Sequence, residues 1–210
     1  MKKVICLVMF FATCLTYSSI AQVVGIRIGV NVYSLRIDES DLQLGFNSVT
    51  RKLENSIGVQ IGGTIEFPLG KFLAIETGLK FDQKGYKITF VESNVSEENL
   101  NLFFLDLPLT VKGKLTAGPF SFYGKIGSYI GSGLVGYVAK TGLSGTKREG
   151  VDFVKGELER LDYGLLGGFG IGIKAIQFEF TYSHGIADAV NGATKHKMMG
   201  FSFGYLFGRK

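Results

Sequence analysis

The fold of this chain is decided by residues 56–86, which read SIGVQIGGTIEFPLGKFLAIETGLKFDQKGY. Apolar side chains fall on every second position on either side of the turn Pro68–Lys71, and Gly, Thr, Gln and charged residues take most positions between them. Alternation with a period of two is typical of a β-strand with one apolar face. The stretch therefore predicts two antiparallel strands joined by a short turn.

The same alternation recurs in further segments, so that the whole chain predicts eight strands. These segments are 24–32, 103–112, 120–131, 162–173, 176–183 and 199–207. The connections alternate in length, with short turns at 68–71, 116–119 and 174–175 and long polar stretches at 37–55, 91–99, 139–160 and 186–196. Short turns at one end and long loops at the other are typical of outer-membrane barrels, which have even numbers of strands from about eight upward.

The direction of the apolar face separates a membrane barrel from a soluble one. A soluble closed barrel such as a lipocalin also alternates, with its apolar side chains inside. Here the alternating faces carry more large apolar side chains than the narrow interior of an eight-stranded barrel can hold. The opposite faces are rich in Gly and Ser with isolated charges, which makes a poor soluble surface. We therefore expect an all-β, eight-stranded antiparallel up-and-down transmembrane β-barrel, with a soluble closed barrel as the alternative.

Aromatic residues near the expected short turns agree with this prediction. They are Phe67, Phe72, Phe120, Phe178 and Phe207. Aromatic side chains gather where a barrel wall meets the lipid headgroups. We expect these residues to form a girdle at one membrane interface.

The first residues, MKKVICLVMFFATCLTYSSIAQ, have the pattern of a secretory signal peptide. Two lysines precede an apolar run, and the small residues Ser19 and Ala21 fit the end of a signal-peptidase site. The apolar run Val4–Leu15 is shorter than the ~20 residues that a membrane-spanning helix needs. We expect a signal peptide over residues 1–21 and one barrel domain over residues 22–210.

Both cysteines of the chain, Cys6 and Cys14, lie in this first segment. The exported chain would therefore carry no disulfide and no thiolate chemistry. Lipidation at Cys14 is the alternative, but Phe11–Thr13 is a poor approach to a lipidated cysteine. The formal net charge of +5 comes from scattered lysines and arginines, so it does not indicate a nucleic-acid partner.

Several of these segments together resemble the PorT-like outer-membrane β-barrel domain family. The most specific are KGY at 84–86 and LDLPL at 105–109, and the others are GIRIGVNVYSLRI, FYGKIGSYIGSGL, DYGLLGGFGIGI and GFSFGYLFG. The resemblance covers nearly all of the chain beyond residue 21. It implies an eight-stranded barrel in the outer membrane of a Gram-negative bacterium. The family is mostly uncharacterised, and one named member is linked to the envelope machinery for protein secretion. The resemblance brings no catalytic motif.

Ser183, His184 and Asp188 are candidates for a hydrolytic site at the rim of the barrel. Adjacent residues of a strand point to opposite faces, so Ser183 would face the lumen and His184 the lipid interface. A proton could not pass directly between them. We therefore interpret His184 as a solvated rim residue and expect no catalytic residue.

Two other features invite comparison with ligand sites. His196 lies in the basic stretch Lys195–Lys197, which suits lipopolysaccharide phosphates or solvent better than a metal, because no second ligand stands at a useful spacing. The glycine-rich stretch Gly164–Gly172 lacks the following helix that a phosphate-binding loop needs. Its glycines instead leave room for side chains in the lumen, and we expect no metal and no cofactor.

Charged residues on the faces opposite the apolar ones form the candidate site of this chain. They are Arg27, Glu76, Lys112, Lys125 and Glu179. Each lies about three to five residues from the short-turn end of its strand, ~10 to 17 Å along it, so they should share one depth in the lumen. Buried charges must be paired or solvated, so their mixed signs predict a plug of ion pairs in which Glu76 lies near Lys112. A conducting path is the alternative, but side chains fill an eight-stranded lumen.

The predicted function is that of a small, non-enzymatic outer-membrane barrel, a membrane anchor whose outer loops or girdle bind a partner. The expected partners are outer-membrane lipid, lipopolysaccharide and an envelope protein, with no nucleic acid. A small outer-membrane hydrolase or acyltransferase acting on lipid is the alternative. The stretch 139–160 is the expected binding element, because it is the longest connection.

Overall fold

The computed structural model describes residues 22–37, 51–90, 95–142, 145–151, 153, 160–188 and 194–207. The expected signal peptide, residues 1–21, lies outside the described residues. In the described part of the chain, no helix is long and apolar enough to cross a membrane. The structure there consists almost entirely of β-strands.

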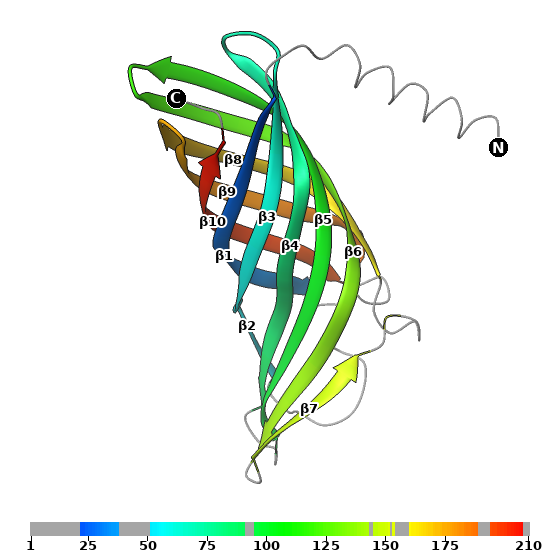
Figure 1. The fold of residues 1–210 in the computed structure, drawn as a ribbon. Coiled ribbons are helices and arrows are strands. Elements are labelled where there is room, and N and C mark those ends of the chain that lie inside the picture. The colour runs from blue at the N-terminus through cyan, green and yellow to red at the C-terminus, as the bar shows by residue number, and fades with distance from the viewer. Residues whose placement is uncertain are drawn as a thin grey trace, which may run out of the picture.

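The described residues form one sheet of ten strands (Figure 1). The strands are β1 (Val23–Ile37), β2 (Arg51–Glu54), β3 (Ser56–Pro68), β4 (Leu73–Phe90), β5 (Val95–Ala117), β6 (Phe120–Gly142), β7 (Gly145–Val151), β8 (Leu161–Ile173), β9 (Ile176–Asp188) and β10 (Thr194–Leu206).

Eight of these described strands close a ring, and each pairs antiparallel with its two neighbours. The order around the ring is β1, β3, β4, β5, β6, β8, β9 and β10, and β10 pairs back with β1. β2 precedes β3, from which Asn55 separates it, and pairs with the far part of β4. β7 pairs with the end of β6. The prediction of an eight-stranded antiparallel up-and-down barrel is confirmed.

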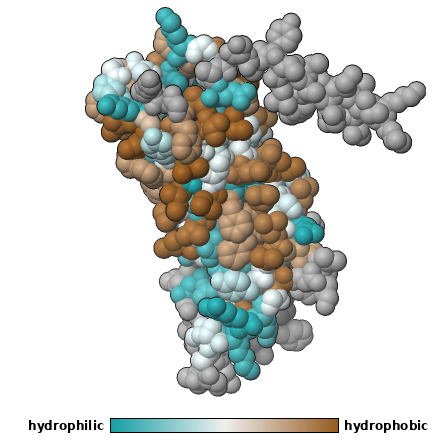
Figure 2. All heavy atoms as spheres, in the orientation of Figure 1, coloured by the Kyte–Doolittle hydropathy of each residue, from teal (hydrophilic) through white to brown (hydrophobic). Residues whose placement is uncertain are grey.

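The outer wall of the barrel is apolar and its interior is polar. Ile57 and Ile126, on two of the predicted apolar faces, are each 73% exposed, whereas Asn31, Lys112 and Gln177 inside are fully buried. Figure 2 shows apolar residues spread over the middle of the wall and polar residues at both of its ends. An apolar surface of this extent is covered by lipid in a membrane barrel. The prediction that the apolar faces point outward is confirmed.

The strands at the long-loop end are longer than predicted. The predicted loop 91–99 is wrong in part, because β5 already begins at Val95. The predicted loop 139–160 is also wrong in part, because β6 runs to Gly142 and forms a hairpin with β7. Strand segments beyond the membrane need no apolar face, so the hydropathy period that identified the other strands is lost there.

A bulge in β6 is a second reason why the alternation of apolar residues does not predict this extension. Phe104 on β5 pairs with Gly133 on β6, but the next residue, Phe103, pairs with Val135. The extra residue, Leu134, reverses which positions of β6 face inward. Alternation counted from the start of β6 therefore points to the wrong face beyond this residue.

Pro108 lies within β5, where a proline removes a hydrogen-bond donor from the sheet. The pairs between β4 and β5 stop at Thr77 and Leu109 and resume at Lys80 and Asp106. The hydroxyl of Thr77 donates a hydrogen bond to the carbonyl oxygen of Pro108 at 2.7 Å. Pairing between β5 and β6 continues past Pro108, so the break is confined to one side of the strand.

Candidate functional site in the barrel lumen

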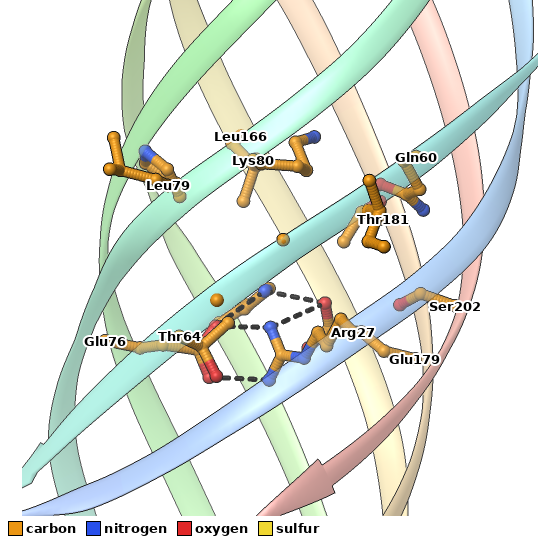
Figure 3. A pocket seen from close by; sticks show the side chains of 15 residues that line it. Arg27, Gln60, Thr64, Glu76, Leu79, Lys80, Leu166, Glu179, Thr181 and Ser202 are labelled. Carbon is orange, nitrogen blue, oxygen red and sulfur yellow. Dashed lines mark hydrogen bonds and ion pairs between the residues drawn. The ribbon is translucent and has the colours of Figure 1, made fainter.

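The charged residues predicted for the candidate site meet inside the barrel. Arg27 on β1 donates to both carboxylate oxygens of Glu76 on β4, at 2.7 and 2.8 Å, and to Glu179 on β9 at 3.2 Å (Figure 3). Lys125 on β6 contacts the same two carboxylates, Glu76 at 2.9 Å and Glu179 at 2.7 Å. Lys112 on β5 adds a 2.9 Å contact to Glu76. The carboxylate of Glu76 thus links cations from three other strands.

Two residues that the sequence reasoning missed extend this group. The carboxylate of Glu66 on β3 lies 3.0 Å from Lys112 and 3.0 Å from Lys114. Glu66 was missed because it stands close to the turn at Pro68, whereas barrel strands tilt and equal counts from a turn do not mean equal depth. Its alternation with Phe67 places it on the lumen face, and that signal could have found it. We call Arg27, Glu66, Glu76, Lys112, Lys114, Lys125 and Glu179 the lower network.

A second group of buried charges lies nearer the long-loop end, and the sequence reasoning missed it as a group. The ammonium of Lys84 on β4 lies 2.9 Å from Asp106 on β5 and 2.7 Å from Asp162 on β8. The hydroxyl of Tyr129 donates to Asp162 at 3.3 Å. Gly131 makes room for this group, because a Cβ there would overlap the carboxylate of Asp106.

The same group continues across the lumen to β1. Lys80 contacts the carboxylate of Asp82 at 2.7 Å, and the side-chain amide of Asn31 donates to the other oxygen of Asp82 at 2.8 Å. All three residues stand on lumen faces. They were missed because the prediction grouped only charges that lie about three to five residues from a short turn, and these residues lie farther from it. We call Asn31, Lys80, Asp82, Lys84, Asp106, Tyr129 and Asp162 the upper network.

An apolar cluster closes the lumen on the long-loop side of the upper network. Leu100, Leu102 and Phe104 of β5 pack with Phe153, and the rings of Phe104 and Phe153 meet edge to face with centroids 6.0 Å apart. A Cβ at Gly133 would lie 2.6 Å from the Phe153 ring, so this glycine provides the space for it. Phe153 belongs to the predicted binding loop, yet here it is buried in the mouth of the barrel.

A small cavity of about 40 Å³ remains inside the barrel. Arg27, Glu76 and Glu179 line one part of it, and Gln60 and Thr181 line another (Figure 3). This volume admits a few water molecules, since each needs about 10 to 15 Å³ by this measure. The amide nitrogen of Gln60 is buried without a partner in the described structure, so water in the cavity can satisfy it.

The two networks together hold as many acidic as basic side chains. The acids are Glu66, Glu76, Asp82, Asp106, Asp162 and Glu179, and the bases are Arg27, Lys80, Lys84, Lys112, Lys114 and Lys125. A lumen lined by one sign of charge concentrates counter-ions, whereas a balanced one does not. The arrangement joins strands across the lumen and fills it.

The structure separates Ser183 from His184 in the candidate hydrolytic site. Ser183 is buried inside the barrel, whereas His184, on the opposite face of β9, is half-buried. The side chain of Asp188 lies outside the described residues. Among the described residues, no group of three or more His, Cys, Asp or Glu side chains is placed to hold a metal ion.

The other two candidate ligand features lie in strands. The predicted basic loop around His196 is wrong, because β10 begins at Thr194 and the backbone of His196 pairs with Leu35 on β1. The side chain of His196 lies outside the described residues. The glycine-rich stretch Gly164–Gly172 runs within β8 with no helix after it, as the sequence predicts.

Comparisons with known proteins give one family. The family model described as an outer membrane protein beta-barrel domain matches residues 20–191. No curated protein matches the chain.

Several solved structures are similar in fold at low identity. The attachment invasion locus protein Ail of Yersinia pestis, in complex with the heparin analogue sucrose octasulfate, is 15% identical, with a TM-score of 0.44 over 89% of this chain and 99% of that one. Neisserial surface protein A is 6% identical, with a TM-score of 0.42 over 87% of this chain and 96% of that one. The N-terminal β-barrel domain of Pseudomonas aeruginosa OprF is 9% identical, with a TM-score of 0.32 over 86% and 97%.

Proposed function

Because this chain belongs to the outer membrane protein beta-barrel domain family and resides in the outer membrane, we propose that it is a closed, non-enzymatic barrel that anchors a binding surface. The barrel holds the chain in the lipid. The strand extensions and loops at the long-loop end bind a partner outside the cell.

The observation that carries this proposal is the filled lumen. Lys112 is fully buried, Lys84 is 2% exposed, and both contact two carboxylates. Buried charges held in this way act as cross-links between strands, because moving one partner leaves the other uncompensated. The apolar cluster around Phe153 adds a further layer at the mouth. The proposal therefore assigns binding to the outside of the barrel and not to a channel.

The finer part of the proposal is a PorT-like accessory of envelope or protein-secretion machinery. Its support is the pair of motifs that carry the resemblance, KGY at 84–86 and LDLPL at 105–109. Lys84 of the first motif and Asp106 of the second form a buried ion pair at 2.9 Å. Lys84 and Asp106 thus join the two motifs within the upper network. Outer-membrane lipid and lipopolysaccharide are the other proposed partners.

The proposed topology places the long-loop end outside the cell. A cysteine at Thr146 in β7 should react with a membrane-impermeant maleimide on intact cells, whereas a cysteine at Lys71 in a short turn should react only after lysis. Both positions are exposed in the structure, so accessibility to the reagent depends on the side of the membrane. Labelling of Lys71→Cys but not Thr146→Cys on intact cells would reverse the orientation.

The filled lumen predicts that the barrel does not conduct. We expect no steady ion current through the full-length protein in planar bilayers, because a cavity of about 40 Å³ offers no continuous path. Insertion should be verified on the same sample by resistance of the barrel to added protease. Steady unitary currents through the unmodified protein would refute the closed-barrel proposal.

A further inference from the structure

The barrel carries a β-hairpin that projects beyond the rest of its rim. β4, β5 and β6 extend past the other ring strands at the long-loop end, and β7 lies at the edge of this extension (Figure 1). β7 pairs with β6 over its whole length, from Gly145 opposite Gly142 to Val151 opposite Gly136. Within the described residues, β7 pairs with no other strand. Among the described strands, its outer edge therefore presents backbone donors and acceptors that pair with no neighbour.

The hairpin is anchored at its base and exposed along the rest of its length. Val151 packs against the apolar cluster that contains Phe153. Every residue of β7 from Gly145 to Gly150 is exposed. Near the tip, the hydroxyls of Thr141 and Thr146 lie 3.1 Å apart across the two strands. The edge is thus held in strand geometry before any partner arrives, which lowers the entropy cost of binding.

The charges on this edge are not balanced within the hairpin. Lys140 on β6 stands directly opposite Lys147 on β7, and like charges at such a position are unfavourable. Glu149 contacts Lys140 at 3.3 Å. On the other face of the hairpin, the guanidinium of Arg148 lies 5.6 Å from the centre of the Tyr137 ring. Lys147 and Arg148 thus offer one cation on each face of the edge strand.

We propose that β7 is a docking edge for an extended acidic segment of another protein. The segment adds to the sheet as a further strand, with backbone hydrogen bonds to β7. Two adjacent carboxylates of the segment point to opposite faces and meet Lys147 and Arg148. The carboxylate beside Lys147 also relieves the repulsion between Lys147 and Lys140.

A second copy of this chain fits the edge less well. Antiparallel pairing of β7 with itself about Arg148 sets the two Arg148 guanidiniums opposite each other, which is unfavourable. The two Lys147–Glu149 pairs that this register also forms compete with the contact that Glu149 already makes with Lys140. Lysine on an edge strand also discourages pairing with strands that lack acids. The proposal rests on the proposed function only in placing the partner outside the cell.

The test is peptide binding to the full-length protein in detergent micelles, followed by fluorescence anisotropy. The probe is a labelled peptide of about ten alternating Thr and Val residues with Glu-Asp at its centre, matched to the usual length of short strands. We expect K147E/R148E to weaken its binding about tenfold or more and to bind the corresponding Lys-Lys peptide instead. The matched control is K71E/K174E, which makes the same change of net charge at the short-turn end and should bind like the unmodified protein.

A second probe separates strand addition from simple charge attraction. The same acidic peptide with every internal backbone nitrogen methylated keeps its charge but loses the donors along both of its edges, so it should not bind. Equal binding of the methylated peptide, equal binding of the Glu-Asp and Lys-Lys peptides to the unmodified protein, or equal loss in both double variants would overturn the proposal. Self-association through β7 that excludes the peptide would also overturn it, in favour of a second copy. Neither orientation nor conductance enters this measurement, so a failure here is distinct from a failure of the closed-barrel proposal.

Discussion

Replacing Glu76 with glutamine is expected to lower the free energy of unfolding by about 3 to 5 kcal/mol. The substitution removes a charge that contacts Arg27, Lys112 and Lys125, and it leaves these cations short of a buried partner. The expected loss falls to about 1 kcal/mol or less if cavity water solvates the cations well. Urea unfolding of the folded barrel in detergent measures the difference.

Two comparisons make this result specific to the lower network. A double-mutant cycle of Glu76→Gln with Lys112→Met should give a clear coupling energy, because the two side chains are 2.9 Å apart and buried. Glu149→Gln is the matched control, since its contact with Lys140 at 3.3 Å is exposed and worth at most about 1 kcal/mol. A coupling energy of zero between Glu76 and Lys112 would show that their contact does not contribute to stability.

Arginine at Ile61 is expected to cost about 2 to 4 kcal/mol in the free energy of folding into lipid. Ile61 lies near the middle of β3, is 57% exposed and points away from the lumen, so an arginine there would place its charge in the hydrocarbon layer. Ile57→Arg is the matched control on the same face. It lies one residue from the long-loop end of β3, where the cost of the same charge falls to about 0 to 1 kcal/mol. Equal costs at the two positions would mean that this face does not cross a bilayer.

Much of the fold follows from alternation, because burial in lipid imposes a period of two on every membrane-spanning strand. Residues 56–86 alone show it, and the same rule identifies the lumen side of Arg27 and Glu76. The extension of β5 and β6 and the hairpin with β7 do not follow, since strands in water carry no such signal. The apolar mouth cluster was missed for a similar reason, because Phe153 follows β7 outside any periodic segment.

The pairing of the lumen charges could be predicted only in part. Alternation identifies which side chains enter the lumen, but tilt and shear determine which of them meet, and these depend on register between strands. The number of residues between each charge and the nearest short turn correctly grouped five residues of the lower network, but it left out Glu66. It also missed Lys84 and Asp162, which come from strands far apart in sequence and meet only when the ring is closed.

The contacts of Arg27 have a consequence for the order of folding. Arg27 sits on β1, whereas its partners Glu76 and Glu179 sit on β4 and β9, on opposite sides of the seam where β1 joins β10. A partly assembled sheet that has not yet joined this seam leaves Arg27 without Glu179 and exposes free strand edges to lipid. Pairing of β1 with β10 therefore brings Arg27 to Glu179 and removes the two free strand edges in the same step. Insertion should proceed as one concerted event, with half-closed barrels too costly to accumulate in the membrane.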